Sequence, residues 1–255
     1  NEQFHCDPRN SLSRYWYACN LLYATLDHAL QIPFMDCIPQ EFEMTVTIAS
    51  FTLGDYQTNC HVVTEGDDCW VIDCGYEPQP LIDHVLTNDL KPSVILLTHC
   101  HSDHIAGLDQ LLSAIGDTPM MCHESEGDWN MNPMLNLSGL AGTPVTATPP
   151  SGFLTPNTPI SLGSSTWQVL HAPGHSPGSL CFVHDESKQA IVGDTLFAGS
   201  IGRHDFPTSN VEDLRNTIAN VLMSLPDEMA IYPGHGPTTT IGEERATNPF
   251  VLHGF

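Results

Sequence analysis

The chain has 255 residues, 41% of them hydrophobic, so it can bury a substantial core as a globular protein. Seven Lys and Arg stand against 30 Asp and Glu, and the resulting formal charge of −23 repels phosphate backbones and anionic lipids. We therefore expect neither a nucleic-acid partner nor a membrane partner, and no stretch reaches the roughly 18 apolar residues that a membrane span requires.

Residues 1–43 differ from the rest of the chain. They show neither helical nor strand periodicity, and no motif falls in them. An apolar run after Arg14 faintly resembles a secretion signal, but Asn20 interrupts it and no small-residue cleavage site follows. We predict that residues 1–43 are an N-terminal extension, poorly ordered or an artefact of the chosen reading frame. The folded domain is then predicted to span residues 44–255, beginning at Met44.

The first half of this domain alternates strands and helices. Apolar alternation and apolar runs indicate strands, turn signals at Gly54 and Gly66 separate them, and helical periodicity follows in two segments. A segment rich in Met, Asn, Gly and Pro, residues 124–158, is predicted to be a loop that forms a lid or rim. Strands are expected at residues 45–53, 58–64, 69–73, 93–97 and 119–122, and helices at residues 80–90 and 105–115.

The second half repeats this organisation. Its strands are each connected to a turn that carries a histidine or an aspartate, and a helix with one apolar face precedes the last strand. Alternation of strands and helices in both halves predicts two packed sheets covered by helices. Strands are expected at residues 166–170, 180–183, 190–192 and 229–232, and a helix at residues 211–225.

Nine cysteines are present, an odd number without any C-x-x-C pair. This argues against a zinc ribbon, a thioredoxin-like motif and a disulfide framework. Reduced thiols fit a cytoplasmic protein, which is the location we predict. Six of the cysteines lie in or beside apolar runs and are predicted to be small buried core residues: Cys60, Cys69, Cys74, Cys100, Cys122 and Cys181.

Residues 99–104, which follow the predicted strand 93–97 after Thr98, hold three imidazoles and a carboxylate. His99 and His101 are two apart, so on an extended backbone they point the same way. Asp103 and His104 then open a helix and can be aimed back at the same point. Neutral imidazole and carboxylate are ligands of zinc, iron and manganese, so this cluster predicts a metal site more strongly than a His-rich loop.

Three further strand ends carry a residue of the same kind. His175 lies in the tight turn A-P-G-H-S-P-G, Asp194 follows the strand 190–192, and His235 lies in P-G-H-G-P. Asp73, near another strand end, is either a partner of a ligand imidazole or a turn-capping aspartate.

The ordered motifs T-H-x-H-x-D-H, P-G-H-x-P-G, G-D-x-L-F and P-G-H-G-P resemble those of the metallo-β-lactamase superfamily. Two finer features, G-S-I-G-R-H-D-F-P at residues 199–207 and the ending at residues 241–250, resemble the glyoxalase II-like (hydroxyacylglutathione) hydrolases of the short bacterial type. The resemblance covers residues 44–250. It implies an α/β fold, an αββα sandwich of two mixed sheets flanked by helices, with the site at one edge.

The resemblance also implies a ligand set and a cofactor. It implies two divalent metal ions, zinc in first place with iron or manganese as alternatives. His99, His101 and His175 would hold the first, whereas Asp103, His104 and His235 would hold the second. Asp194 would bridge both ions, and Asp103 would also orient the attacking hydroxide or take up its proton.

The implied reaction is the hydrolysis of an acyl thioester such as S-lactoylglutathione, a small-molecule partner. Arg203 matches the position where glyoxalase II enzymes use a basic residue to hold the glutathione moiety, and a guanidinium can bind a carboxylate in bidentate fashion. A surface arginine in a salt bridge is the competing interpretation. His123 and His204 are expected near the mouth of the site, where either could contact substrate.

Other functions stay open at this stage. Full-length glyoxalase II has a helical C-terminal domain that adds glutathione contacts. Because only a handful of residues follow residue 250 here, we expect that domain to be missing, which leaves glutathione as the carrier open. A persulfide dioxygenase with one iron shares the fold and the H-x-H-x-D-H cluster, and a β-lactamase-like hydrolase is a further alternative. A metal-binding module without catalysis is disfavoured by the complete set of seven candidate ligands. The sequence does not indicate an oligomeric state.

Overall fold

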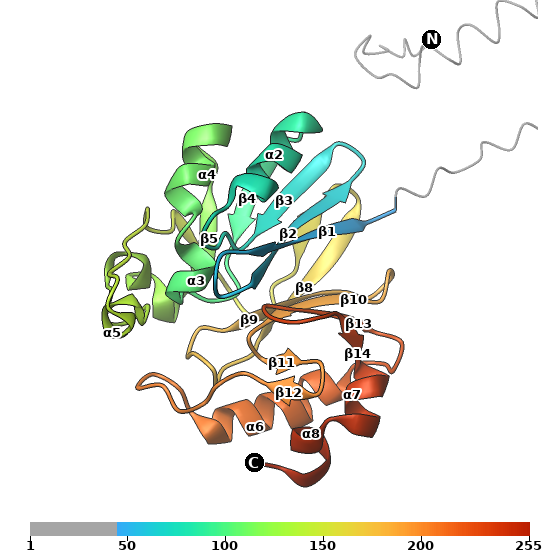
Figure 1. The fold of residues 1–255 in the computed structure, drawn as a ribbon. Coiled ribbons are helices and arrows are strands. Elements are labelled where there is room, and N and C mark those ends of the chain that lie inside the picture. Colours follow the sequence, from blue (N-terminus) through green and yellow to red (C-terminus); the bar gives the residue numbers. More distant parts are fainter. Residues whose placement is uncertain (1–44) are drawn as a thin grey trace, which may run out of the picture. The chain divides into compact units, whose positions relative to one another are not determined.

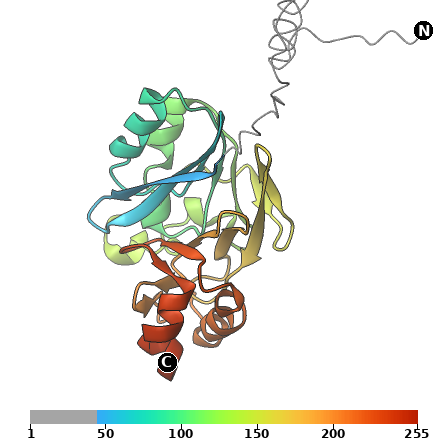
Figure 2. The same cartoon turned by 90° about the vertical axis from the view of Figure 1, so that its right-hand side faces the viewer.

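The computed structural model describes residues 45–255. The predicted extension of residues 1–43 lies outside this range, so the extension and its boundary at Met44 stay predictions. Two six-stranded sheets pack face to face, and helices cover the outer face of each (Figure 1; Figure 2 shows the same layers turned by 90°). The predicted αββα sandwich is confirmed.

The first sheet has the strand order β1-β2-β3-β4-β5-β6. Its first two pairs are antiparallel and its other pairs are parallel, so the sheet is mixed. Helices α2 and α4 pack on its outer face. The elements are β1 (Thr47–Leu53), β2 (Thr58–Glu65), β3 (Asp68–Ile72), α2 (Gln79–Thr87), β4 (Pro92–Leu96), α4 (Leu108–Ile115), β5 (Met120–His123) and β6 (Gly152–Leu154).

The second sheet has the order β14-β13-β10-β9-β8-β7. The pair β10–β13 is parallel, and the other neighbouring strands of this sheet pair antiparallel. Helices α6, α7 and α8 pack on its outer face. The elements are β7 (Ile160–Leu162), β8 (Ser165–His171), β9 (Leu180–His184), β10 (Gln189–Gly193), α6 (Val211–Asn220), β13 (Ala230–Pro233), β14 (Thr239–Thr240), α7 (Ile241–Thr247) and α8 (Pro249–His253).

Strand alternation divides the apolar side chains among three layers. Successive residues of a strand point to opposite faces, so β3 sends Val71 towards the helices and Ile72 towards the other sheet. Between the sheets, Trp70 packs against Trp167 with ring centroids 5.9 Å apart. Both faces of the central strands are therefore buried, which is why they read as apolar runs in the sequence.

The six cysteines that the sequence placed in the core are free thiols with no exposed surface. Burial raises the pKa of Cys69 and of Cys181 to about 12. These thiols stay protonated at neutral pH and pack as small apolar side chains, as predicted.

The predicted helix over residues 105–115 is wrong in one respect, because the structure divides it into α3 (Ser102–Ile105) and α4. The break lies at Gly107, which packs so closely on a neighbouring turn that a Cβ would lie 2.2 Å from the carbonyl oxygen of Gly75. Its N–H donates to the carbonyl of Cys74 at 2.9 Å instead of continuing a helix. A tertiary contact thus overrides the apolar periodicity.

Two other expectations need correction. The predicted helix over residues 211–225 ends as α6 at Asn220 and is followed by the 3₁₀ turn η3 (Leu222–Ser224). The segment 124–158, predicted as a loop, contains regular structure and contributes β6 to the first sheet. Short elements that the sequence did not indicate are η1 (Glu124–Glu126), η2 (Trp129–Met131), α5 (Ser138–Ala141), β11 (Leu196–Phe197) and β12 (Ser200–Ile201).

Helices in the described residues are short, and even α6 has only 10 residues. Within residues 45–255, no helix is both long and apolar enough to cross a bilayer.

Candidate metal centre

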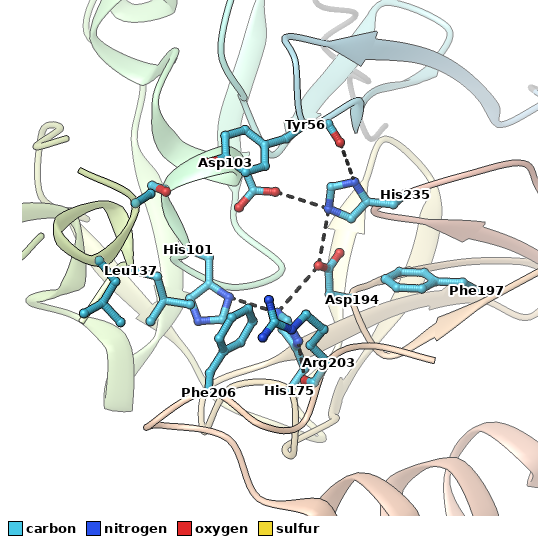
Figure 3. A pocket seen from close by; sticks show the side chains of 13 residues that line it. Tyr56, His101, Asp103, Leu137, His175, Asp194, Phe197, Arg203, Phe206 and His235 are labelled. Carbon is cyan, nitrogen blue, oxygen red and sulfur yellow. Dashed lines mark hydrogen bonds and ion pairs between the residues drawn. The ribbon is translucent and has the colours of Figure 1, made fainter. Parts of the chain in front are cut away.

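The predicted site residues come from four strand ends that meet at one edge of the sandwich (Figure 3). His99 lies shortly after β4, and His175 lies in the turn after β8. Asp194 directly follows β10, and His235 follows β13. Residues far apart in sequence therefore converge because strands of both sheets end on the same side.

Helix α3 turns the first cluster towards that point. His101 is its N-cap, with an extended backbone (φ −69°, ψ 153°), whereas Asp103 and His104 lie in its short helical turn. The change from strand-like to helical backbone within four residues brings all their side chains to one side, as the sequence predicted.

The structure brings all seven predicted ligands together. Ligand-type atoms of His99, His101 and His175 lie within 4.8 Å of one another, and those of Asp103, His104 and His235 do the same. In the first group, His101 Nδ1 lies 2.9 Å from His175 Nε2. In the second group, His235 Nε2 lies 3.2 Å from Asp103 Oδ2.

Asp194 lies between the two groups. Its Oδ1 is 3.3 Å from His104 Nε2, and its Oδ2 is 3.5 Å from His175 Nε2 and 3.4 Å from His235 Nε2. The carboxylate thus contacts imidazoles of both groups (Figure 3), which is the arrangement that a bridging ligand requires.

The outward ring nitrogens of the histidines have protein partners. His104 Nδ1 pairs with Asp73 Oδ2 at 2.8 Å, and His175 Nδ1 donates to the backbone carbonyl of Arg203 at 2.8 Å. His235 Nδ1 donates to the backbone carbonyl of Tyr56 at 3.1 Å. Such outer hydrogen bonds fix ring orientation and tautomer, and they leave Nε2 of these three rings for a metal.

Asp73 links two of the candidate ligands. It is buried, and its carboxylate accepts from the Thr98 backbone N–H at 2.8 Å and from Thr98 Oγ1 at 2.7 Å as well as pairing with His104. Because Thr98 Oγ1 donates to Asp73, it can accept from His99 Nδ1, 3.1 Å away. Of the two interpretations left open by the sequence, the partner of a ligand imidazole is the one that the contacts match.

The loop that carries His235 is tied to the first sheet. The Asn59 side-chain amide donates to the carbonyl of Pro233 at 3.0 Å and to that of Gly236 at 2.8 Å, and Thr58 forms an isolated β-bridge with His235. The second sheet supplies the histidine, whereas the first sheet fixes its position.

Glycines make room for Asp194. A Cβ on Gly234 would lie 2.1 Å from Asp194 Oδ1, and a Cβ on Gly202 would lie 1.8 Å from the Asp194 carbonyl oxygen. These close approaches explain why residue 234 in the P-G-H-G-P motif and residue 202 in the G-R-H-D-F motif are glycines.

The three-histidine group is electrically neutral. Burial lowers the pKa of His99 and of His101 well below the usual range, and neighbouring imidazoles lower both further. Burial also lowers the pKa of His175, against the opposing effect of Asp194. At neutral pH these rings are uncharged, the form that binds a metal.

The second group is made of opposite charges. Burial lowers the pKa of His235, but hydrogen bonds to Asp103 and Asp194 raise it more, to about 10. Burial likewise opposes the charge on His104, yet Asp103, Asp194 and Asp73 raise its pKa well above the usual value. Burial raises the pKa of Asp103, and His104 and His235 outweigh it, so that the value is about 2.

The donor set fits divalent metal ions. His99 and His104 each have a buried Nε2, and Asp194 a buried Oδ1, without a hydrogen-bond partner among the described residues. Buried polar atoms are normally satisfied, and orphaned ones call for an explanation. Imidazole nitrogens and a carboxylate oxygen that share one point are ligands for zinc, iron or manganese.

A cavity of about 480 Å³ opens over these residues (Figure 3). Arg203 is part of its lining, with a side chain that is 64% exposed. The guanidinium forms a bidentate ion pair with Asp205 at 2.9 and 3.0 Å and lies 4.1 Å above the Phe206 ring. One wall is apolar, made of Leu137, Leu140 and Ala141.

Two histidines expected at the mouth do not line the cavity. His123 stacks on His171 with ring centroids 4.5 Å apart, and His204 lies beside Phe255. Sequence reasoning instead missed Trp129, which stacks on His101 with centroids 5.7 Å apart. Its position in the supposed loop 124–158 gave no signal of that contact.

Comparison with known proteins agrees with this geometry. The profile of the metallo-beta-lactamase superfamily matches residues 53–235. The chain is 35% identical to the hydroxyacylglutathione hydrolase GloC of Haemophilus influenzae over 199 residues, 77% of this chain and 93% of that protein.

Two solved structures are similar as well. The BLEG-1 B3 metallo-beta-lactamase is 36% identical, with a TM-score of 0.77. The match covers 80% of this chain and 99% of that chain. TTHA1623 in a di-iron-bound form is also 36% identical, with a TM-score of 0.70 and coverage of 79% and 99%. Since the profile spans most of the chain and these relatives match almost end to end, the chain belongs to the metallo-β-lactamase superfamily, as a metallo-hydrolase.

Proposed function

We propose that the protein is a dinuclear metal-dependent hydrolase of acyl thioesters, with S-lactoylglutathione as the reference substrate. The observation that carries the proposal is the position of Asp194 between two groups of three ligand-type residues. The di-iron form of a relative that is 36% identical supports two ions. Zinc is proposed as the metal, with iron or manganese as alternatives, and the cytoplasm as the location.

His99, His101 and His175 would hold one ion, and Asp103, His104 and His235 the other, with Asp194 shared. Bound there, the ions would supply a hydroxide nucleophile at neutral pH and polarise the thioester carbonyl. The protein's own contribution is to orient these groups. Asp103 lines the cavity, and its Oδ2 accepts from Thr58 Oγ1 at 3.0 Å, so the carboxylate is fixed where it can orient the attacking water or accept its proton.

The cavity lining offers a substrate one cationic contact beside the candidate metal ligands. It includes the buried rings of His101 and His175, and Arg203 is the only Lys or Arg in the lining among the described residues. We propose that Arg203 gives up its exposed ion pair with Asp205 and binds a carboxylate of the carrier instead. A small thioester is the proposed partner, and neither nucleic acid nor a membrane is proposed as one.

The test is thiol release from S-lactoylglutathione by the full chain reconstituted with zinc, measured without oxygen. Release in proportion to bound metal, and none from chelated protein, is the expected result. Parallel arms follow opening of a chromogenic cephalosporin and oxygen uptake with glutathione persulfide. Rapid β-lactam opening without thioester cleavage would favour the activity of the BLEG-1 relative, and oxygen uptake without anaerobic thioester cleavage would favour the persulfide dioxygenase.

A further inference from the structure

A buried carboxylate lies directly behind the three-histidine group. Glu126 is the last residue of η1 and has no exposed surface. Its Oε2 accepts from the Cys100 backbone N–H at 2.7 Å. Its Oε1 accepts from Ser176 Oγ at 2.5 Å and from the Gly178 backbone N–H at 2.7 Å.

The groups that Glu126 binds belong to two different ligand loops. Cys100 stands between His99 and His101, and Ser176 directly follows His175. Each carboxylate oxygen thus holds one loop, and the two loops come from different sheets. Between them, His101 Nδ1 and His175 Nε2 are 2.9 Å apart, a spacing that depends on how the loops are held.

This contact requires an acceptor at both carboxylate oxygens. The Cys100 and Gly178 N–H groups can only donate, and they approach different oxygens, so Glu126 accepts on both sides. An amide of the same shape would turn its NH₂ towards either Cys100 or the pair Ser176 and Gly178 and leave donors facing a donor. The site is built around the group, because a Cβ at Gly178 would lie 2.7 Å from Glu126 Cγ.

Burial makes a charge on Glu126 costly in free energy. Among the described residues, no basic side chain forms a salt bridge with this carboxyl group. Burial raises the pKa of Glu126, while hydrogen bonds from Ser176, Cys100 and Gly178 lower it in part. A core that needed only stability could place an apolar side chain here at lower cost. The three donors instead indicate a task in fixing the loops.

We propose that Glu126 is a positioning residue, which clamps the His99–His101 loop to the His175 loop and so sets the spacing of the first metal's three imidazoles. The proposal rests on the metal-binding part of the proposed function and not on the choice of substrate.

The test compares Glu126→Gln with Glu124→Gln, an identical substitution at an exposed position of the same 3₁₀ turn. Zinc affinity is measured by competition with a chelating dye, in the wild-type background and in two backgrounds that each lack one ligand. His235→Ala weakens the second group, and His175→Ala weakens the first. We expect Glu126→Gln to weaken zinc binding about 10–100-fold in the His235→Ala background. In the His175→Ala background it should change zinc affinity less than twofold.

In the otherwise wild-type chain, Glu126→Gln should lower kcat with little change in KM, while Glu124→Gln behaves as wild type. Unchanged zinc affinity in the His235→Ala background would overturn the proposal. Equal weakening in both backgrounds would also overturn it, because that is the result of a general loss of structure. If Glu126→Gln does not fold, Ser176→Ala removes one of the three donors and should weaken the first group alone, a few-fold. Because zinc binding is read directly, the proposal can stand even if thioesters are not cleaved.

Discussion

The two halves of the candidate centre are built on opposite electrostatic principles. The half made of His99, His101 and His175 is buried and uncharged, since burial lowers the pKa of each ring. The other half pairs cationic imidazoles with carboxylates, and its His235 is 27% exposed. The first half is therefore ready to accept a cation, whereas the second already compensates its own charges and must lose protons first.

Their supports differ as well. Glu126 forms its hydrogen bonds with groups of two loops and with no candidate ligand ring, whereas Asp73 pairs directly with the imidazole of His104. Asp73 also reaches His99 through Thr98. One carboxylate thus sets distances between loops, and the other sets the orientation of rings.

The largest effect is expected where the two halves meet. Asp194→Ala should lower zinc content below two ions per chain and reduce kcat/KM for the thioester at least about a thousandfold, ~4 kcal/mol in the barrier, because Asp194 contacts both groups. Elemental analysis and steady-state kinetics measure the two effects, with Asp185→Ala in an exposed turn as the control. A variant that keeps both ions and its activity would contradict the bridging role.

Replacing Asp73 should affect both halves, in contrast to Glu126. Asp73→Asn removes a charged partner of His104 and alters the Thr98 contact to His99. We expect zinc affinity to fall about 10–100-fold in the His235→Ala background and by a similar factor in the His175→Ala background. If zinc affinity fell only for the second group, the contact from Asp73 through Thr98 to His99 would not contribute to metal binding.

The number of protons released on zinc binding should differ between the two halves. At pH 7.5 the metal-free protein carries a proton on His235, whose pKa is about 10, and another on His104, whose pKa is raised well above the usual value. Zinc binding should therefore release about two protons from the second group and none from the first. Calorimetry in buffers of different ionisation enthalpy counts them.

The sign of the pH dependence follows from the same shifts. Apparent zinc affinity of the second group should rise with pH up to about 10, because fewer protons then have to be displaced. The first group should show no such rise above pH 7, since its rings are already neutral. Identical pH profiles of zinc affinity in the His235→Ala and His175→Ala backgrounds would contradict the difference in charge between the two groups.

The smallest effect is expected at the rim. Arg203→Ala should raise KM about fivefold with kcat nearly unchanged, because an exposed ion contact contributes roughly 1 kcal/mol or less and is made in ground and transition states alike. Arg215→Ala, which removes an arginine paired with Glu212 on α6, is the control. A fall in kcat with constant KM would instead assign Arg203 to the transition state.

The candidate ligands could be read from the sequence because each stands in a short turn motif at a strand end. His175 and His235, for example, are presented by Pro and Gly residues whose backbone restrictions are local. The order of the motifs and the alternation of strands and helices were enough to predict the sandwich. Local patterns thus identified what lies at the edge of the sheets.

Contacts between distant segments could not be read in this way. Glu126 lies in a stretch without periodicity, and its partners Cys100 and Ser176 are 26 and 50 residues away. The break at Gly107 arises from the approach of Gly75, 32 positions earlier in the chain, rather than from a local helix-stop signal. In both cases the determining neighbour is fixed only when the fold is complete.

The side chain of Asn59 has a consequence for the order in which the centre is made. It secures the loop of His235 by hydrogen bonds to Pro233 and Gly236, the latter 177 residues further along the chain. A ribosome adding about 5–20 residues per second needs roughly 9–35 s to cover that span. During translation, His99, His101, Asp103 and His104 are synthesised well before the last histidine, so this histidine and its anchor cannot yet meet. The complete set of seven candidate ligands therefore forms only after His235 and its loop have been synthesised.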